Sequence, residues 1–237
     1  MLPIVFFGQS QIDSSKRILM IGLQFSVQKP GYQLEQRFGN SLNVGIPIFY
    51  KTKSNFLFGI EGNYFFGNTV KEDVLGSFRN QDGTIINNTG VPATIRIFER
   101  GFNLFAEAGK IIPISTKNKN SGFLALAGIG YLQHKIKFYN PARDVAQLAG
   151  TKYKGYDRLS GGIAFSGFVG YFYLSKNKLA NFYLGIESIY GITNGLRGYQ
   201  YDLMQEDNKK RIDGLTGLRV GWILPLYKRT PQEFYYN

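Results

Sequence analysis

Residues 19–27 alternate strictly between two kinds of side chain. The odd positions are apolar and the even positions are mostly small or polar: Leu19, Ile21, Leu23, Phe25 and Val27 against Met20, Gly22, Gln24 and Ser26. A period of two predicts a β-strand with two chemically different faces. Soluble β-sandwiches also alternate, so the composition of the two faces has to decide what each face meets.

The same two-faced pattern recurs eight times along the chain. Strands are predicted at about 17–28, 40–51, 56–67, 95–111, 122–138, 159–174, 181–192 and 214–227. Their apolar face is aliphatic with aromatics towards its ends, whereas the other face is rich in Gly, Asn, Gln and Glu. Strands with lipid outside and a polar interior have this composition. The pattern therefore predicts an all-β fold, an eight-stranded antiparallel up-and-down transmembrane β-barrel.

The connections between the predicted strands alternate between long and short. The long ones cover about 29–39, 68–94, 139–158 and 193–213, and the short ones about 51–55, 112–121 and 175–180. In outer-membrane barrels the long loops lie outside the cell and the short turns lie in the periplasm. We therefore expect an integral protein of the outer membrane of a Gram-negative bacterium, with both chain ends on the periplasmic side.

Aromatic residues near the strand ends support this orientation. A girdle at the membrane surface is expected from Tyr50, Phe56, Tyr131, Tyr171, Tyr173, Tyr190, Trp222 and Tyr227. The alternative is a soluble, lipocalin-like barrel of eight strands. Such a barrel would carry its apolar residues inside and its polar residues outside, which is the opposite sense.

A single barrel, residues 11–228, accounts for most of the chain. Residues 1–10 are largely apolar and end in Gly8-Gln9-Ser10, small residues of the kind that a signal peptidase reads. They are interpreted as the remnant of a signal peptide. The basic region that normally precedes such a segment is missing, so an apolar leader packed in the mature protein is the alternative. Residues 229–237 are expected to form a short periplasmic tail.

The composition excludes several kinds of chemistry. The absence of cysteine excludes disulfides, thiolate metal sites and a cysteine nucleophile. One histidine leaves little material for a zinc site, so neither a metal nor a cofactor is expected. There is no apolar stretch of the length that a membrane-spanning helix needs.

The net charge of +12 first suggests nucleic acid as a partner, but the placement of the charges does not. Short connections without acidic residues carry many of the lysines, whereas the longer loops mix both signs. We therefore expect no nucleic acid and a basic periplasmic rim made of Lys51, Lys53, Lys117, Lys119, Lys176 and Lys178. This rim would bind anionic lipid headgroups or an acidic periplasmic partner.

Four ionisable residues are predicted to point into the barrel from the middle of their strands: Glu61, Glu107, Glu187 and Arg219. Eight strands enclose only enough space for side chains, and an isolated buried charge is costly. These residues are therefore expected to form a network centred on Arg219 that plugs the lumen. Three carboxylates against one guanidinium leave an excess of negative charge, so a proton or cation site is the alternative.

His134 and Ser160 fall at facing ends of neighbouring predicted strands. Some outer-membrane barrels are lipid-modifying enzymes that use a His/Ser pair with a carboxylate. That mechanism needs a nucleophile, a base and an orienting group within mutual reach, which spacing cannot show. A polar histidine at the barrel rim is the interpretation we prefer, and no catalytic residues are assigned.

The second long connection contains Thr69-Val-Lys-Glu72, a capping-box pattern. Val70, Val74, Leu75 and Phe78 follow at helical spacing. A short amphipathic helix is expected here, which either folds over the barrel mouth or docks on another protein. The fourth long connection, with the segment 199–205, offers aromatics for an interface.

In architecture the chain resembles small eight-stranded outer-membrane proteins of the OmpA/OmpX type. The last strand, Gly217-Leu-Arg-Val-Gly-Trp-Ile-Leu-Pro-Leu-Tyr227, carries this resemblance together with the turn and loop lengths. The segment 50–64, with its many Lys, Asn, Tyr, Phe and Ile residues, resembles segments of outer-membrane β-barrel and PorT-like proteins of the Bacteroidota. That resemblance implies a non-enzymatic barrel and, by analogy with members that belong to larger machines, an accessory role in secretion, barrel assembly or nutrient uptake.

The expected partners are therefore the lipids of the outer membrane, with phospholipid in the inner leaflet and lipopolysaccharide in the outer leaflet, and other outer-membrane proteins. A narrow channel for small or hydrophobic solutes is the alternative function. A lipid-modifying enzyme is the second alternative.

Overall fold

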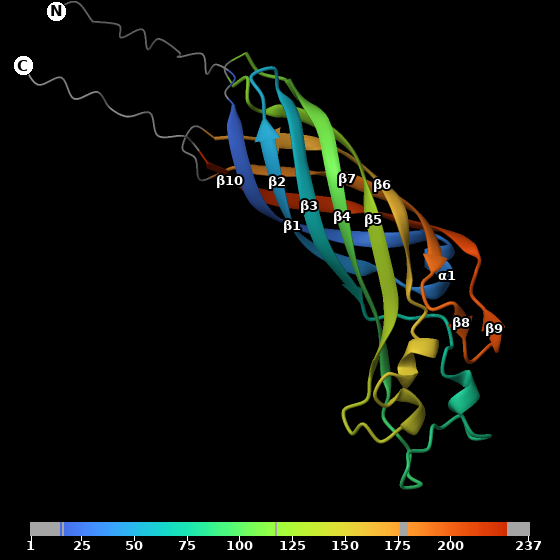
Figure 1. The fold of residues 1–237 in the computed structure, drawn as a ribbon. Helices are drawn as coiled ribbons and strands as arrows, with labels where there is room; N and C mark the ends of the chain where they lie inside the picture. The colour runs from blue at the N-terminus through green and yellow to red at the C-terminus, as the bar shows by residue number, and fades with distance from the viewer. Residues whose placement is uncertain (1–14, 16, 117, 176–179, 227–237) are drawn as a thin grey trace, which may run out of the picture.

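The computed structural model describes residues 15, 17–116, 118–175 and 180–226. Eight long antiparallel strands close into a ring in the order β1-β10-β7-β6-β5-β4-β3-β2 (Figure 1). Their bounds are β1 Ile18–Tyr32, β2 Ser41–Lys51, β3 Phe56–Gly67, β4 Arg96–Pro113, β5 Gly122–Tyr139, β6 Ser160–Tyr173, β7 Phe182–Gly195 and β10 Lys210–Leu226. The predicted fold class, an eight-stranded antiparallel up-and-down barrel, is confirmed.

The two ends of the barrel differ. One end, the turn end, carries the short connections after β2, β4 and β6, and the opposite loop end carries the long ones (Figure 1). We call the segments 68–95, 140–159 and 196–209 the second, third and fourth loops. The loops hold the remaining elements: α1 Gln33–Arg37, the 3-10 helices η1 Gly76–Phe78, η2 Ala146–Leu148 and η3 Lys152–Gly155, and the hairpin of β8 Tyr199–Gln200 with β9 Gln205–Glu206.

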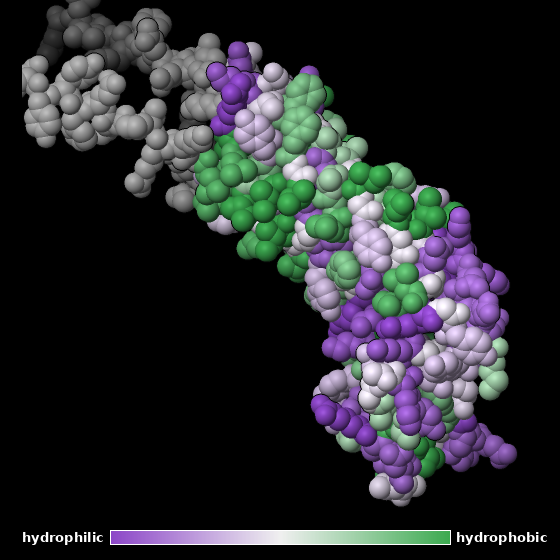
Figure 2. All heavy atoms as spheres, viewed as in Figure 1, coloured by the Kyte–Doolittle hydropathy of each residue, from purple (hydrophilic) through white to green (hydrophobic). Residues whose placement is uncertain are grey.

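The barrel wall has the two faces that the alternation predicts. Leu23 and Leu218 are 57% and 63% exposed, whereas their inward neighbours Gln24 and Arg219 are 3% and 2% exposed. On the visible face, apolar residues gather over the half nearer the turn end, and hydrophilic residues gather towards the loop end (Figure 2). Such a continuous apolar exterior is unfavourable in water and favourable in lipid.

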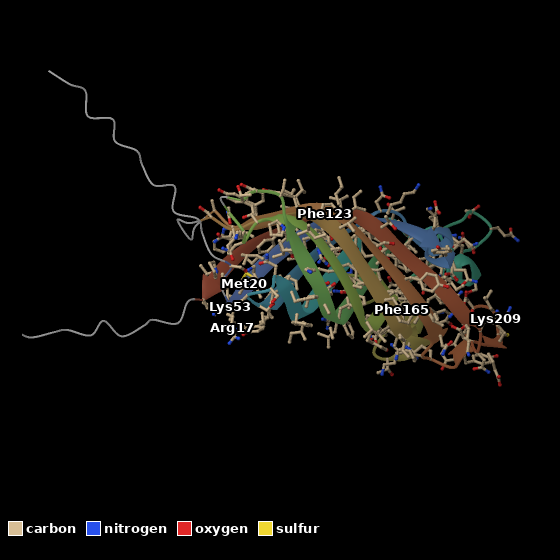
Figure 3. The ribbon with its side chains drawn as sticks, turned by 90° about the horizontal axis from the view of Figure 1, so that it is seen from above. Arg17, Met20, Lys53, Phe123, Phe165 and Lys209 are labelled. Atoms are coloured by element: carbon tan, nitrogen blue, oxygen red, sulfur yellow. The ribbon has the colours of Figure 1, made fainter. Side chains whose placement is uncertain are left out.

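Aromatic residues occupy the margins of this exterior. The outward side chains that are exposed include Tyr50, Phe56, Tyr131, Tyr171, Tyr190 and Trp222, while Tyr173 is partly buried and Tyr227 lies outside the described residues. Phe123 and Phe165 stand on the wall between the turn end, where Lys53 lies, and the loop end, where Lys209 lies (Figure 3). In the described part of the chain, no helix has the length and apolar character needed to cross a membrane.

The barrel interior is less polar than predicted. A turn-end apolar cluster and a loop-end apolar cluster fill it on either side of a central polar layer; they include Met20, Phe49, Leu57, Phe172 and Ile223 at the turn end and Leu34, Phe38, Phe65, Leu132 and Leu215 at the loop end. The expectation of a polar lumen was wrong for these two layers. A barrel of eight strands has no room for a water column, so apolar side chains fill the space at less cost than polar ones.

Both predicted terminal segments, residues 1–10 and 229–237, lie outside the described residues. The signal-peptide remnant and the periplasmic tail stay predictions. From Ile18 to Leu226, the described strands form one closed unit.

Candidate functional site

Arg219 lies in the middle of the barrel interior, between the two apolar clusters. Its Nη1 donates to both carboxylate oxygens of Glu61, at 3.1 and 3.0 Å, and lies 3.4 Å from an oxygen of Glu187. Its Nη2 lies 3.7 Å from Glu107 Oε2. All three carboxylates are almost completely buried. The structure thus brings together the four ionisable residues that are predicted to point inward from the middle of their strands, and we call them the lumen charge network.

Neutral side chains add hydrogen bonds to this network. Each carboxylate accepts a hydrogen bond from a polar side chain: Glu61 from Gln24 (3.1 Å), Glu187 from Gln28 (2.7 Å) and Glu107 from Ser166 (2.9 Å). The rings of Phe168 and Tyr183 lie against the Arg219 guanidinium, at 4.7 and 5.6 Å from its carbon. These contacts hold the guanidinium in the barrel cross-section; that the network plugs the lumen stays a prediction.

Gly45 makes room for a further part of the polar layer. A Cβ at this position would lie 1.7 Å from Oδ1 of Asn63. That amide accepts a bond of 2.5 Å from Gln24 and donates one of 2.7 Å to Asn103. Because Gly45 has no side chain, the Asn63 amide has room to bond both Gln24 and Asn103.

A second buried polar cluster lies near the loop end, around Asp213. Asp213 accepts from Arg37 at 2.9 Å, from His134 Nε2 at 2.9 Å and from Thr193 Oγ1 at 2.5 Å. Arg37 belongs to α1, which folds over the barrel mouth. Its guanidinium also donates to Ser160 Oγ at 3.3 Å. Asp213, His134 and Ser160 are all fully buried.

This cluster does not assemble a nucleophile with a base. His134 and Ser160 are direct partners in the ladder between β5 and β6, as their positions predict. However, the Ser160 hydroxyl donates to the carbonyl of Arg158 at 3.1 Å, and His134 is paired with Asp213 instead. Nucleophilic catalysis requires a Ser–His contact and access for a substrate, and this geometry offers neither.

Within the described residues, no group of three or more His, Cys, Asp or Glu side chains is arranged to hold a metal ion.

The second loop corrects a prediction. No α-helix forms over residues 69–78; Val70 makes an isolated β-bridge with Phe38, and η1 is a single turn. The predicted helix was wrong because a short isolated helix is marginal, whereas the bridge and the apolar contacts below it are available. Val74 and Leu75 are 0% and 4% exposed in the loop-end apolar cluster. They cover the barrel mouth and leave no apolar stripe for a partner. Phe78 packs partly buried against the same cluster.

Arg158 ties three loops together at the loop end. This third-loop side chain donates to Glu72 of the second loop at 2.6 Å and to both oxygens of Asp202 of the fourth loop, at 2.7 and 2.6 Å. Its backbone adopts φ +48°, a left-handed conformation that is costly for arginine. The ion pairs hold it there, and we call the joined loops the cap.

Aromatic contacts reinforce the cap. The ring of Tyr156 lies 4.8 Å from that of Phe78 and 5.7 Å from that of Tyr201. A Cβ on Gly155 would lie 1.9 Å from the Tyr201 ring, so only glycine permits this approach. Arg197 adds a bidentate pair with buried Asp157, at 3.0 and 2.6 Å. The third and fourth loops therefore form one packed body.

The basic rim is smaller than predicted. Lys51 is fully buried, and its Nζ donates to Asn120 Oδ1 at 2.9 Å and to Ser15 Oγ at 3.0 Å inside the turn end. Its place beside a turn suggests the rim, but the alternation of β2 puts Lys51 on the inward face of the strand. Lys53 and Lys119 are exposed, whereas Lys117, Lys176 and Lys178 lie outside the described residues.

No family model matches the sequence, and no curated protein matches it. Several solved structures have a similar fold. Neisserial surface protein A is 12% identical, with a TM-score of 0.42, over 86% of this chain and 95% of that one. The attachment invasion locus protein Ail of Yersinia pestis is 10% identical, with a TM-score of 0.45, over 88% and 99%. The outer membrane protein OprG of Pseudomonas aeruginosa is 12% identical, with a TM-score of 0.33, over 91% and 98%. These values carry no inference about function.

Proposed function

We propose that this chain is a non-enzymatic outer-membrane barrel that works as an accessory subunit of an envelope complex and contacts its partner with the cap. In this orientation the loop end lies outside the cell and the turn end lies in the periplasm. The observation that carries the proposal is the contrast between a filled lumen and loops that are tied into one body by Arg158. A pre-organised surface lowers the entropic cost of binding a partner.

The tip of the fourth loop is the part of the cap that we assign to the partner. The hairpin of β8 and β9 presents Tyr201, Leu203 and Met204, which are 51%, 53% and 81% exposed. Exposed Met, Leu and Tyr side chains on a fixed support are typical of protein interfaces. Their support by Tyr156 and Gly155 below the hairpin keeps them in place.

A site-specific crosslink tests this proposal directly. Because the chain has no cysteine, Met204→Cys introduces a single reactive group for a photo-crosslinker. We expect one dominant crosslinked protein after irradiation of native membranes and co-purification in mild detergent. Lys53→Cys at the turn end is the matched control and should not capture that protein. A chain that stays free of crosslinks from Met204 and migrates as a lone particle would contradict the proposal.

A narrow channel is the rival function, and single-channel recording in planar bilayers separates the two. The lumen charge network and both apolar clusters fill the cross-section, so we expect no steady current from the purified protein. Sustained, reproducible current steps would favour the channel.

A further inference from the structure

The outer wall of the barrel carries a basic groove at the loop end. It has a volume of about 830 Å³ and lies between the loop-end parts of β3, β4 and β5 and the overhanging third loop. Four of its lining residues are cationic: Arg100 on β4, Lys135 and Lys137 on β5, and Arg143 in the third loop. Among the residues that the structure describes, no carboxylate lines it. Basic side chains therefore gather at the loop end as well as at the predicted rim of the turn end.

Within the described part of the chain, the cations of the groove have no carboxylate partner. Arg100 and Lys135 face each other directly across the ladder of β4 and β5, a placement that is unfavourable for like charges. Arg100 Nη1 donates to the carbonyl of Gly67 at 3.2 Å, and its guanidinium stands over the Phe98 ring. Among the described residues, none of the four cations forms an ion pair with a carboxylate. An external anion would relieve the repulsion.

The groove lies where the apolar exterior ends. Two residues from Arg100 towards the turn end, Phe102 is 42% exposed on the outer wall, and Leu104 beyond it is 55% exposed. On β5, Tyr131 lies opposite Leu104, four residues from Lys135 towards the turn end; it is 36% exposed, and its ring lies 6.0 Å from that of Phe102. Aromatics of this kind mark the membrane surface, so the cations above them stand at the level of the lipid headgroups. A lipid phosphate is the anion available at that level.

We propose that this groove binds the phosphorylated sugar headgroup of an outer-leaflet glycolipid, with Arg100, Lys135 and Lys137 on the phosphate. The volume exceeds what a phosphate alone needs and falls within the usual range for a small-molecule site. Gln133, Asn140 and Tyr153 also line the groove and supply amide and hydroxyl groups suited to a sugar. This binding site goes beyond the partner role of the cap and does not depend on it.

Native mass spectrometry of the full chain in detergent tests the proposal. The probes are a bisphosphorylated, hexa-acylated glucosamine disaccharide lipid, the same lipid without phosphates, phosphatidylglycerol and inorganic phosphate. We expect the phosphorylated glycolipid to bind at least about tenfold more tightly than the dephosphorylated form, since each nearby lysine contributes to phosphate affinity. The double variant Lys135→Gln/Lys137→Gln should lose most of that difference.

The matched control is Lys53→Gln/Lys119→Gln, which removes the same charge from exposed lysines at the turn end. It should bind the glycolipid as the unaltered chain does, and heat-dependent migration in gels verifies that both variants are folded. Equal binding of the dephosphorylated lipid, or equal weakening in the control, would overturn the site. Phosphatidylglycerol binding as tightly as the glycolipid, or displacement by an equal amount of inorganic phosphate, would overturn the assignment to a phosphorylated sugar. None of these outcomes involves the hairpin at Met204. A negative result in this binding test therefore leaves the proposed partner role of the cap untouched, and a negative crosslinking result leaves the groove untouched.

Discussion

Arg219 is paired with carboxylates that are almost completely buried, so its loss should affect the fold more than the loss of any exposed cation. Removing one partner of a buried ion pair leaves uncompensated charge and costs about 3–5 kcal/mol. Arg219→Ala should therefore lower the free energy of unfolding by about that amount in urea titrations in lipid vesicles. Lys53→Ala, on an exposed residue, should change it by less than about 0.5 kcal/mol. Equal, small losses in both variants would refute a structural network.

Gly45 gives a second prediction at the same scale. A methyl group there overlaps Asn63 and comes within 2.8 Å of the Gly62 carbonyl, so the amide has to leave its partners. We expect Gly45→Ala to destabilise the barrel by about 1–3 kcal/mol. Gly62→Ala is the control, because its Cβ would point outward with its nearest neighbour at 3.8 Å. Urea titration of both variants measures the difference, and a neutral Gly45→Ala would show that the lumen adapts.

At the scale of elements, the cap should loosen without the barrel when its central arginine is lost. The Arg158 side chain is 3% exposed and forms ion pairs with the second and fourth loops. Arg79 and Asp73, in contrast, form an exposed pair within one loop. Arg158→Met should raise the rate of proteolysis in the fourth loop about tenfold or more, since charged hydrogen bonds contribute about 1.5–3 kcal/mol each. Arg79→Met should have little effect. Barrel migration in gels should be unchanged in both. Unchanged proteolysis in Arg158→Met would show that aromatic packing alone holds the cap.

A hydrogen bond joins the second and third loops, and we expect it to depend on pH. Asn87 Nδ2 donates to Asp144 at 2.7 Å, and this hydrogen bond holds the pKa of the Asp144 carboxyl below its ordinary value. A depressed carboxyl pKa means that the contact is fully formed above the ordinary pKa and is lost as the pH falls through the lowered value. The side-chain amide signal of Asn87 in NMR spectra should therefore titrate with a midpoint below the ordinary pKa of an aspartate. Asp144→Asn should abolish that titration, and a midpoint above the ordinary value would contradict the contact.

At the scale of the whole molecule, alternation alone predicts which side chains face lipid and which face the lumen, because strand geometry enforces it. The same rule places the lumen charge network. It fails where tertiary contacts decide: Asp213 belongs to β10, which begins before the predicted strand, and Arg37 reaches it from an unpredicted helix. Arg158 has no local signal at all, since its partners Glu72 and Asp202 come from distant loops.

The ladder between β1 and β10 pairs residues from the two extremes of the described chain, from Leu19 with Leu226 to Tyr32 with Asp213. Contacts of such sequence separation form late and slowly during folding. Until β10 arrives, β1 offers an open hydrogen-bonding edge to any other strand, and Glu61 lacks its cation from β10. Biogenesis must therefore keep β1 shielded for the whole period of synthesis and transport. A chain shortened by its last strand should yield aggregates and no smaller barrel.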